Sequence, residues 1–101
     1  MYWARHEKMN DALKNVLRYL LIHNIIGGKH IPEHIMLKMN VAHLRPFERR
    51  EFFKEYKSLI NQDYIFKQKK RTGKNYDEHI SLNAGHVEEI NSWLEETNEV
   101  E

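Results

Sequence analysis

The densest group of side chains able to do chemistry is the segment 67–74, whose sequence is KQKKRTGK. It places five cations within eight residues, around a single glycine. Lysine and arginine side chains that meet phosphate release counterions, and an arginine at a hairpin tip can enter a narrow minor groove. The alternative is a solubilised hairpin whose charges keep the edge of its sheet from aggregating. The cations assigned to phosphate contact are Lys67, Lys69, Lys70, Arg71 and Lys74.

A second basic group precedes this segment, in residues 45–62. Arginine can donate two hydrogen bonds to O6 and N7 of guanine, so an arginine at the start of a helix is a candidate for base contact. The candidates for DNA contact in this group are Arg45, Arg49, Arg50 and Lys54. Three glutamates are interleaved with these cations. They either neutralise the cations at i, i+3 or i, i+4 spacing or repel phosphate.

Catalytic and metal-binding patterns are missing from the sequence. It has no cysteine, which removes disulfides, thiolate ligands and cysteine nucleophiles. His30 and His34 are four residues apart, but Pro32 lies between them, so they would not share a helical face as metal ligands. Asp77 and Glu78 are adjacent and would leave opposite faces of a strand, which prevents them from acting as an acid–base pair. Without a GxSxG, P-loop or HExxH motif, we expect no enzyme activity, no metal and no cofactor.

Charge is distributed unevenly along the chain, although the net charge is only +1. Residues 1–44 carry six cations and three carboxylates, residues 45–74 carry ten and four, and residues 75–101 carry none and eight. A basic middle and an acidic end favour a protein with one-sided electrostatics. The alternative is that solvated faces simply differ in sign. If the basic middle contacts phosphate, the carboxylates after residue 75 should face away from it.

The spacing of apolar residues predicts the helices that position these groups. A first amphipathic helix begins at Asn10 or Asp11 and ends at the pair Gly27-Gly28, where glycine can take the left-handed conformation. Pro32 suits the first turn of a second, short helix. The expected buried face of that second helix is Ile35, Met36 and Met39. A third helix starts at Pro46. Its apolar stripe is Phe52, Phe53, Tyr56, Leu59 and Ile60.

After Asp63 the apolar period changes from helical to alternating, which predicts a β-hairpin over residues 64–82. Gly73 supplies the positive φ that its tip needs. Asn83 is a suitable cap for a last helix. The apolar face of that helix is Val87, Ile90, Trp93 and Leu94.

This order of elements, with a short extended segment before the second helix, resembles the winged helix-turn-helix superfamily over residues 11–95. The segment LINQDYIFKQKKRTGKNYDEHISLN looks like the join of recognition helix and wing in small archaeal and phage-type regulators. The resemblance implies an α+β fold with a three-helix core, a β-hairpin wing and a C-terminal helix. Residues 45–62 would be the recognition helix and residues 67–74 the wing. The superfamily also contains modules that bind only protein.

Aromatic residues lie near both ends of the chain, and terminal helices often form the interface in winged-helix dimers. The residues expected in a homodimer interface are Tyr2, Trp3, Leu13, Trp93 and Leu94. The alternative is that these side chains close the core of one small domain. The whole chain, residues 1–101, is expected to be one domain. Residues 1–10 would form an arm or helix extension, and residues 96–101 a frayed acidic tail.

The sequence thus favours sequence-specific binding of double-stranded DNA by a homodimeric transcriptional regulator. Two alternatives stay open: docking of the basic region on an acidic partner protein, and binding of double-stranded RNA. The longest apolar run is too short to span a membrane, and the N-terminus lacks the apolar core of a signal peptide. These features predict a cytoplasmic protein.

Overall fold

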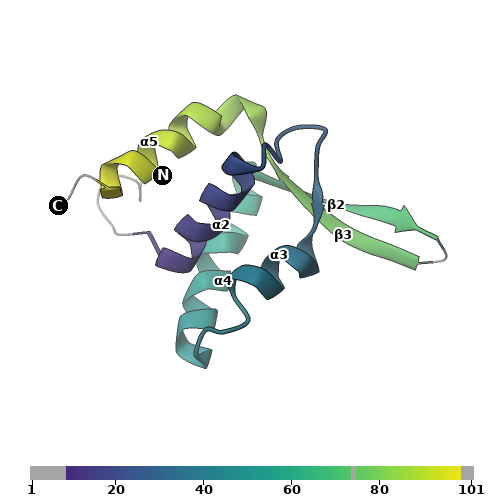
Figure 1. Ribbon diagram of the computed structural model, residues 1–101, viewed down its shortest axis with the longest axis horizontal. Helices are drawn as coiled ribbons and strands as arrows, with labels where there is room; N and C mark the ends of the chain where they lie inside the picture. The colour runs from purple at the N-terminus through teal and green to yellow at the C-terminus, as the bar shows by residue number, and fades with distance from the viewer. Residues whose placement is uncertain (1–8, 74, 99–101) are drawn as a thin grey trace.

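The computed structural model describes residues 9–73 and 75–98. Within them the helices are α2 (Asp11–Ile22), α3 (Glu33–Asn40), α4 (Pro46–Asn61) and α5 (Val87–Asn98), with a short 3₁₀ helix η1 (Ala84–His86) before α5. The strands are β1 (Ile31–Pro32), β2 (Ile65–Thr72) and β3 (Asn75–Leu82). Figure 1 shows the helices gathered together and the two long strands extending away from them. The fold is α+β, as the sequence predicts.

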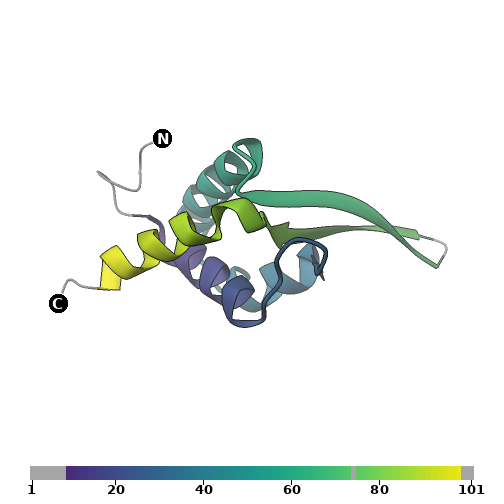
Figure 2. The same ribbon diagram turned by 90° about the horizontal axis from the view of Figure 1, so that it is seen from above.

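The three strands form one antiparallel sheet in the order β1-β3-β2. β2 and β3 pair along their whole length, from Ile65 opposite Leu82 to Thr72 opposite Asn75. Gly73 turns the chain at the tip with a φ of +62°, which glycine adopts without strain. The predicted hairpin is therefore confirmed. Both views show that it projects from the helices (Figures 1 and 2).

One apolar core joins the helices to the root of the hairpin. α2 contributes a fully buried stripe at helical spacing, and α4 packs its aromatic face against it. The sheet contributes Ile65, Ile80 and Leu82, all with no exposed surface. Asn10 caps α2 as predicted, because its side-chain oxygen accepts hydrogen bonds from the backbone N–H groups of Ala12 and Leu13.

The first helix ends at Ile22, four or five residues before the glycine pair at which the sequence predicted its end. Asn24 takes the left-handed conformation, with a φ of +56°. Ile25 N–H then donates to the Leu20 carbonyl at 2.8 Å, which closes the helix in a Schellman motif. This early stop lets Ile25 reach the sheet, where its carbonyl accepts from Leu82 N–H at 3.0 Å.

The second helix is also more exposed than its sequence predicted. Only Met36 of α3 is fully buried, whereas Ile35 and Met39 are exposed. Pro32 precedes the helix as its N-cap instead of lying in its first turn. The reason is that α3 bridges two neighbours by its ends, so that little of its length lies over the core. Glu33 at its start contacts the hairpin, and Ala42 just beyond its end contacts α4.

Candidate nucleic-acid interface

The exposed side of α4 separates its cations from its carboxylates. Arg50, Lys54 and Lys57 follow one another at steps of four and three residues, so they form a single row, here called the α4 cation row. All three side chains are exposed. The glutamates lie along the other edge of the exposed side, at positions 48, 51 and 55. The interleaving in the sequence therefore becomes two separate edges on the helix.

The acidic edge of α4 faces the start of α2. Glu55 Oε1 accepts a hydrogen bond from Asn10 N–H at 3.0 Å. Glu48 turns back on the first turn of α4, where its Oε1 accepts from the backbone N–H of Arg45 at 2.9 Å. Among the described residues, no carboxylate forms an ion pair with a member of the α4 cation row. The row is therefore free to meet an external anion.

Arg49 has a structural role that its sequence position did not reveal. Its Nη2 donates to the carbonyl of Ala42 at 3.1 Å and to that of Leu44 at 2.8 Å. Both carbonyls belong to the turn between α3 and α4, so Arg49 braces that turn. Arg45 is exposed at the start of α4, and its side chain makes no capping hydrogen bond. We therefore keep base contact as a prediction for Arg45 and Arg50 and assign Arg49 to the turn.

Lys67, at the root of the hairpin, is also held by the protein itself. Its Nζ lies 3.2 Å from Glu33 Oε2 and 4.0 Å from Glu78 Oε1. The hydroxyl of buried Tyr56 donates to the same Glu33 oxygen at 2.6 Å. Burial, together with the hydrogen bond and charge of Glu33, raises the pKa of Tyr56 well above its ordinary value. Lys67 therefore joins β2 to α3 and α4, and the assignment of Lys67 to phosphate contact is corrected.

The remaining hairpin cations lie on two faces. In the register of the sheet Lys69 is opposite Glu78 and Lys70 is opposite Asp77. Because side chains alternate along a strand, Lys69 and Arg71 share the face that Lys67 turns to α3, and Lys70 lies on the other face. Two of the carboxylates after residue 75 thus lie beside the basic strand, contrary to expectation. Lys74 lies outside the described residues.

The face of the hairpin that carries Lys70 also carries a histidine pair. His30 Nδ1 and His79 Nδ1 are 2.7 Å apart, which requires one ring to donate and the other to accept. Partial burial, the charge of Lys70 and the neighbouring His79 lower the pKa of His30. The pair joins the segment before β1 to β3, and Gln68 lies opposite His79. A second proton on the pair would place two cations in contact.

We expect the stabilising effect of His30 to be lost as pH falls. The folded state resists protonation of this ring, whereas the unfolded chain protonates near pH 6.5 (the model value). The difference in free energy of unfolding between the wild-type protein and His30→Gln should therefore shrink between about pH 7.5 and 5. Urea unfolding at a series of pH values measures this difference. A difference that stays constant over the range would contradict the lowered pKa.

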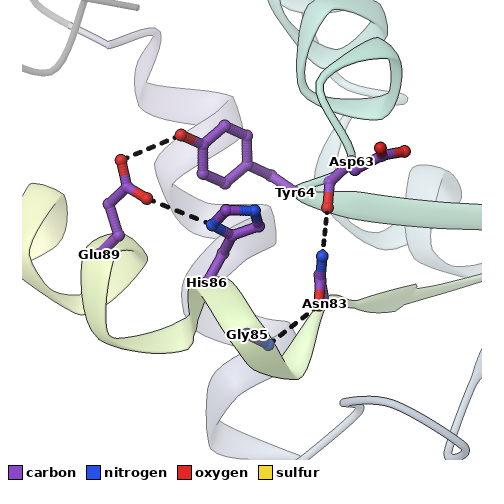
Figure 3. A network of polar contacts seen from close by, with 6 residues as sticks. All are labelled: Asp63, Tyr64, Asn83, Gly85, His86 and Glu89. Atoms are coloured by element: carbon purple, nitrogen blue, oxygen red, sulfur yellow. Dashed lines mark hydrogen bonds and ion pairs between the residues drawn. The ribbon is translucent and has the colours of Figure 1, made fainter.

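A polar network fixes α5 to the start of the hairpin (Figure 3). The Tyr64 hydroxyl donates to Glu89 Oε2 at 2.9 Å, and the other oxygen of Glu89 lies 3.3 Å from His86 Nδ1. Asn83 joins the two chain segments, because its Nδ2 donates to the Asp63 carbonyl at 2.8 Å. Burial and Glu89 together raise the pKa of Tyr64. The acidic helix is thereby held on the side of the molecule away from the hairpin tip (Figures 1 and 2).

Three residues expected in a dimer interface lie in the core of one copy. Leu13 has no exposed surface, and Trp93 and Leu94 are each 6 % exposed. The Trp93 ring packs against Tyr64, with 4.9 Å between the ring centroids. This is a correction, because side chains enclosed by their own domain present no surface to a second copy. Tyr2 and Trp3 lie outside the described residues.

Two exposed aromatic residues were missed by sequence reasoning. Phe47 is 63 % exposed and lies 5.9 Å below the guanidinium carbon of Arg50. Tyr76 is 60 % exposed and has the guanidinium carbon of Arg71 6.0 Å from its ring centroid. Helical phase was the available signal for Phe47, which lies on the side of α4 away from its buried stripe. Cross-strand pairing was the signal for Tyr76, which lies opposite Arg71.

A shallow hollow of about 370 Å³ lies between α3 and α4. Its apolar lining comes from Leu37, Val41, Ala42 and Phe53. His34, Lys38 and Arg49 also line it, and no carboxylate does. The described residues contain no group of three or more histidine, aspartate or glutamate side chains placed to hold a metal ion. None of the described helices is long and apolar enough to cross a membrane.

Comparison of the chain with protein-family models, with curated proteins and with solved structures gave no match. The functional argument therefore starts from the geometry of the molecule itself.

Proposed function

We propose that this protein binds double-stranded DNA as a winged helix-turn-helix protein, with α4 as the recognition helix and the β2–β3 hairpin as the wing. The order of helices and strands and the sheet order β1-β3-β2 support this assignment. In this arrangement α4 enters the major groove and the wing meets the sugar–phosphate backbone. Control of transcription is the role that we propose for such binding.

The observation that carries the proposal is the separation of charge on α4. A helix whose cations and carboxylates were mixed would gain little from phosphate, because each carboxylate would cancel a nearby cation. Here Arg50, Lys54 and Lys57 form one exposed row without ion pairs among the described residues. The acidic α5 is held on the side away from the hairpin tip (Figure 2). These features together leave one basic side.

A salt titration tests this function. We expect the wild-type protein to bind duplex DNA of random sequence at low salt, and log K to fall linearly with log salt concentration. Each phosphate contact should contribute a slope of about −0.9. A duplex RNA of the same length provides the comparison that separates DNA from RNA binding. Failure to bind any duplex at low salt would reject the proposal.

The hollow between α3 and α4 favours a second candidate, an acidic partner protein. Its apolar lining would take a bulky side chain, while Lys38 and Arg49 would meet carboxylates beside it. This candidate predicts that Phe53→Ala weakens partner binding and leaves duplex affinity unchanged. It becomes the preferred function if no duplex binds.

A further inference from the structure

Phe47 is an unusual residue for the position it occupies. It lies in the first turn of α4, and its side chain is 63 % exposed among charged neighbours. The core of the domain is closed without it, because the buried stripe of α4 is formed by Phe52, Tyr56 and Leu59. Isolated exposed apolar residues are common and need no explanation by themselves. The position of Phe47 relative to the cations gives it one.

Phe47 begins the same line of residues that forms the α4 cation row. Arg50 follows it by three residues and Lys54 by seven, which places all three side chains on one exposed strip of the helix. The guanidinium carbon of Arg50 lies 5.9 Å from the centroid of the Phe47 ring, within the range of a cation–π interaction. No described carboxylate pairs with Arg50. The ring is thus the contact that orients the guanidinium.

Contact with an aromatic ring uses the face of a guanidinium and leaves its N–H edge available. That edge matches O6 and N7 of guanine, which accept two parallel hydrogen bonds in the major groove. The aromatic ring itself matches the C5-methyl group of thymine, the one apolar group on the floor of that groove. Neighbouring bases on a strand are separated by only about 3.4 Å, so one side-chain pair can contact both.

We propose that Phe47 and Arg50 act together on a 5-methylpyrimidine–guanine step, with Arg50 bonded to guanine and Phe47 packed against the methyl group of the preceding thymine. The inference rests on the proposed function and specifies its base contacts. The glutamates do not obstruct it, because Glu48 is bonded to the N–H of Arg45 and Glu55 to that of Asn10. A TG step is also among the more deformable steps of duplex DNA, which eases entry of a ring.

The experiment uses the full chain and three forms of one duplex. The duplex is the tightest binder selected from a random library by the wild-type protein, and we expect it to contain a TG step. The thymine of that step is then replaced by uracil, which lacks the methyl group, or by 5-methylcytosine opposite guanine, which restores it. The wild-type protein should bind the uracil form roughly 3- to 5-fold more weakly, as expected for one buried methyl group. The 5-methylcytosine form should recover this loss relative to unmethylated cytosine.

Variants decide whether Phe47 and Arg50 are responsible. Phe47→Ala should bind the thymine and uracil forms equally, at about the affinity of the wild-type protein for the uracil form. Arg50→Lys keeps the charge but loses the two-pronged donor, so its preference for guanine should fall roughly 5- to 100-fold. The matched control is Phe66→Ala, which removes a phenyl ring that is 39 % exposed on β2, and it should retain both preferences.

The outcomes separate this inference from the function beneath it. A wild-type protein that binds duplexes with a steep salt dependence but does not distinguish thymine from uracil overturns the inference and leaves the proposed function standing. Methyl discrimination that survives Phe47→Ala overturns it as well. Absence of any duplex binding overturns both. Unfolding midpoints equal to the wild-type value establish that the variants remain folded.

Discussion

The combined replacement of Lys69 and Lys70 by alanine should weaken binding to every duplex, by roughly 10- to 60-fold at 0.1 M salt. Each lost phosphate contact removes about 0.9 from the salt slope, which amounts to nearly a tenfold loss of affinity between 1 M and 0.1 M salt. Sequence preference should change little, because a lysine meets the backbone as a point charge and does not contact base edges. Affinity measured against salt concentration, on both a selected and a random duplex, checks both parts.

The two single variants report which face of the hairpin contacts the backbone. Lys69 shares its face with Arg71 and the side of the hairpin joined to α3, whereas Lys70 lies on the face of the histidine pair. If only the α3 face meets DNA, Lys69→Ala should carry the whole change and Lys70→Ala should have almost none. The control is Lys69→Arg with Lys70→Arg, which keeps both charges. Full affinity and an unchanged slope in the alanine double variant would exclude the wing from the interface and favour protein docking.

Local signals account for the parts of the fold that the sequence predicted. Asn10 before an amphipathic stretch gives the start of the first helix, because capping depends on residues only two and three positions away. Gly73 between two alternating segments gives the hairpin and its tip. In both cases the partners are neighbours in the sequence.

The helix ends show where local signals mislead. The sequence offered Gly27 and Gly28 as a stop, yet Asn24 takes the left-handed position. Asp63 does the same after α4, with a φ of +67°, where Tyr64 N–H donates to the Leu59 carbonyl at 2.9 Å. Asparagine and aspartate tolerate this conformation, and burial of the next apolar residue decides where it is used. That choice depends on the packed core.

The candidate interface divides in the same way. Helical phase alone separates Arg50 and Lys54 from the glutamates, so this part of the site is available from the sequence. The roles of Lys67 and Arg49 are not, because their partners are distant or belong to backbone that only the fold positions. Glu33 lies thirty-four residues before Lys67, and the carbonyls bound by Arg49 belong to the turn before α4. A cation in the sequence therefore does not reveal whether its charge is already used.

The replacement Trp93→Ala should lower the free energy of unfolding by about 3–5 kcal/mol, a large part of the total for a domain of this size. The indole is 6 % exposed and packs against Tyr64, whose hydroxyl is bonded to Glu89 on the same helix as Trp93. Its removal leaves a cavity and loosens the contact between α5 and the start of β2. Tyr76→Ala provides the control, since a ring that is 60 % exposed should change stability by less than about 0.5 kcal/mol.

The dependence of that loss on protein concentration separates the core from a dimer interface. A tryptophan buried within one copy destabilises the monomer, so the loss should be the same at two concentrations roughly a hundredfold apart. A tryptophan at a dimer interface would give a wild-type midpoint that rises with concentration and a variant midpoint that does not. Sedimentation of both proteins completes the test. A loss that appears only at high concentration would return Trp93 and Leu94 to an interface, because only association couples stability to the amount of protein.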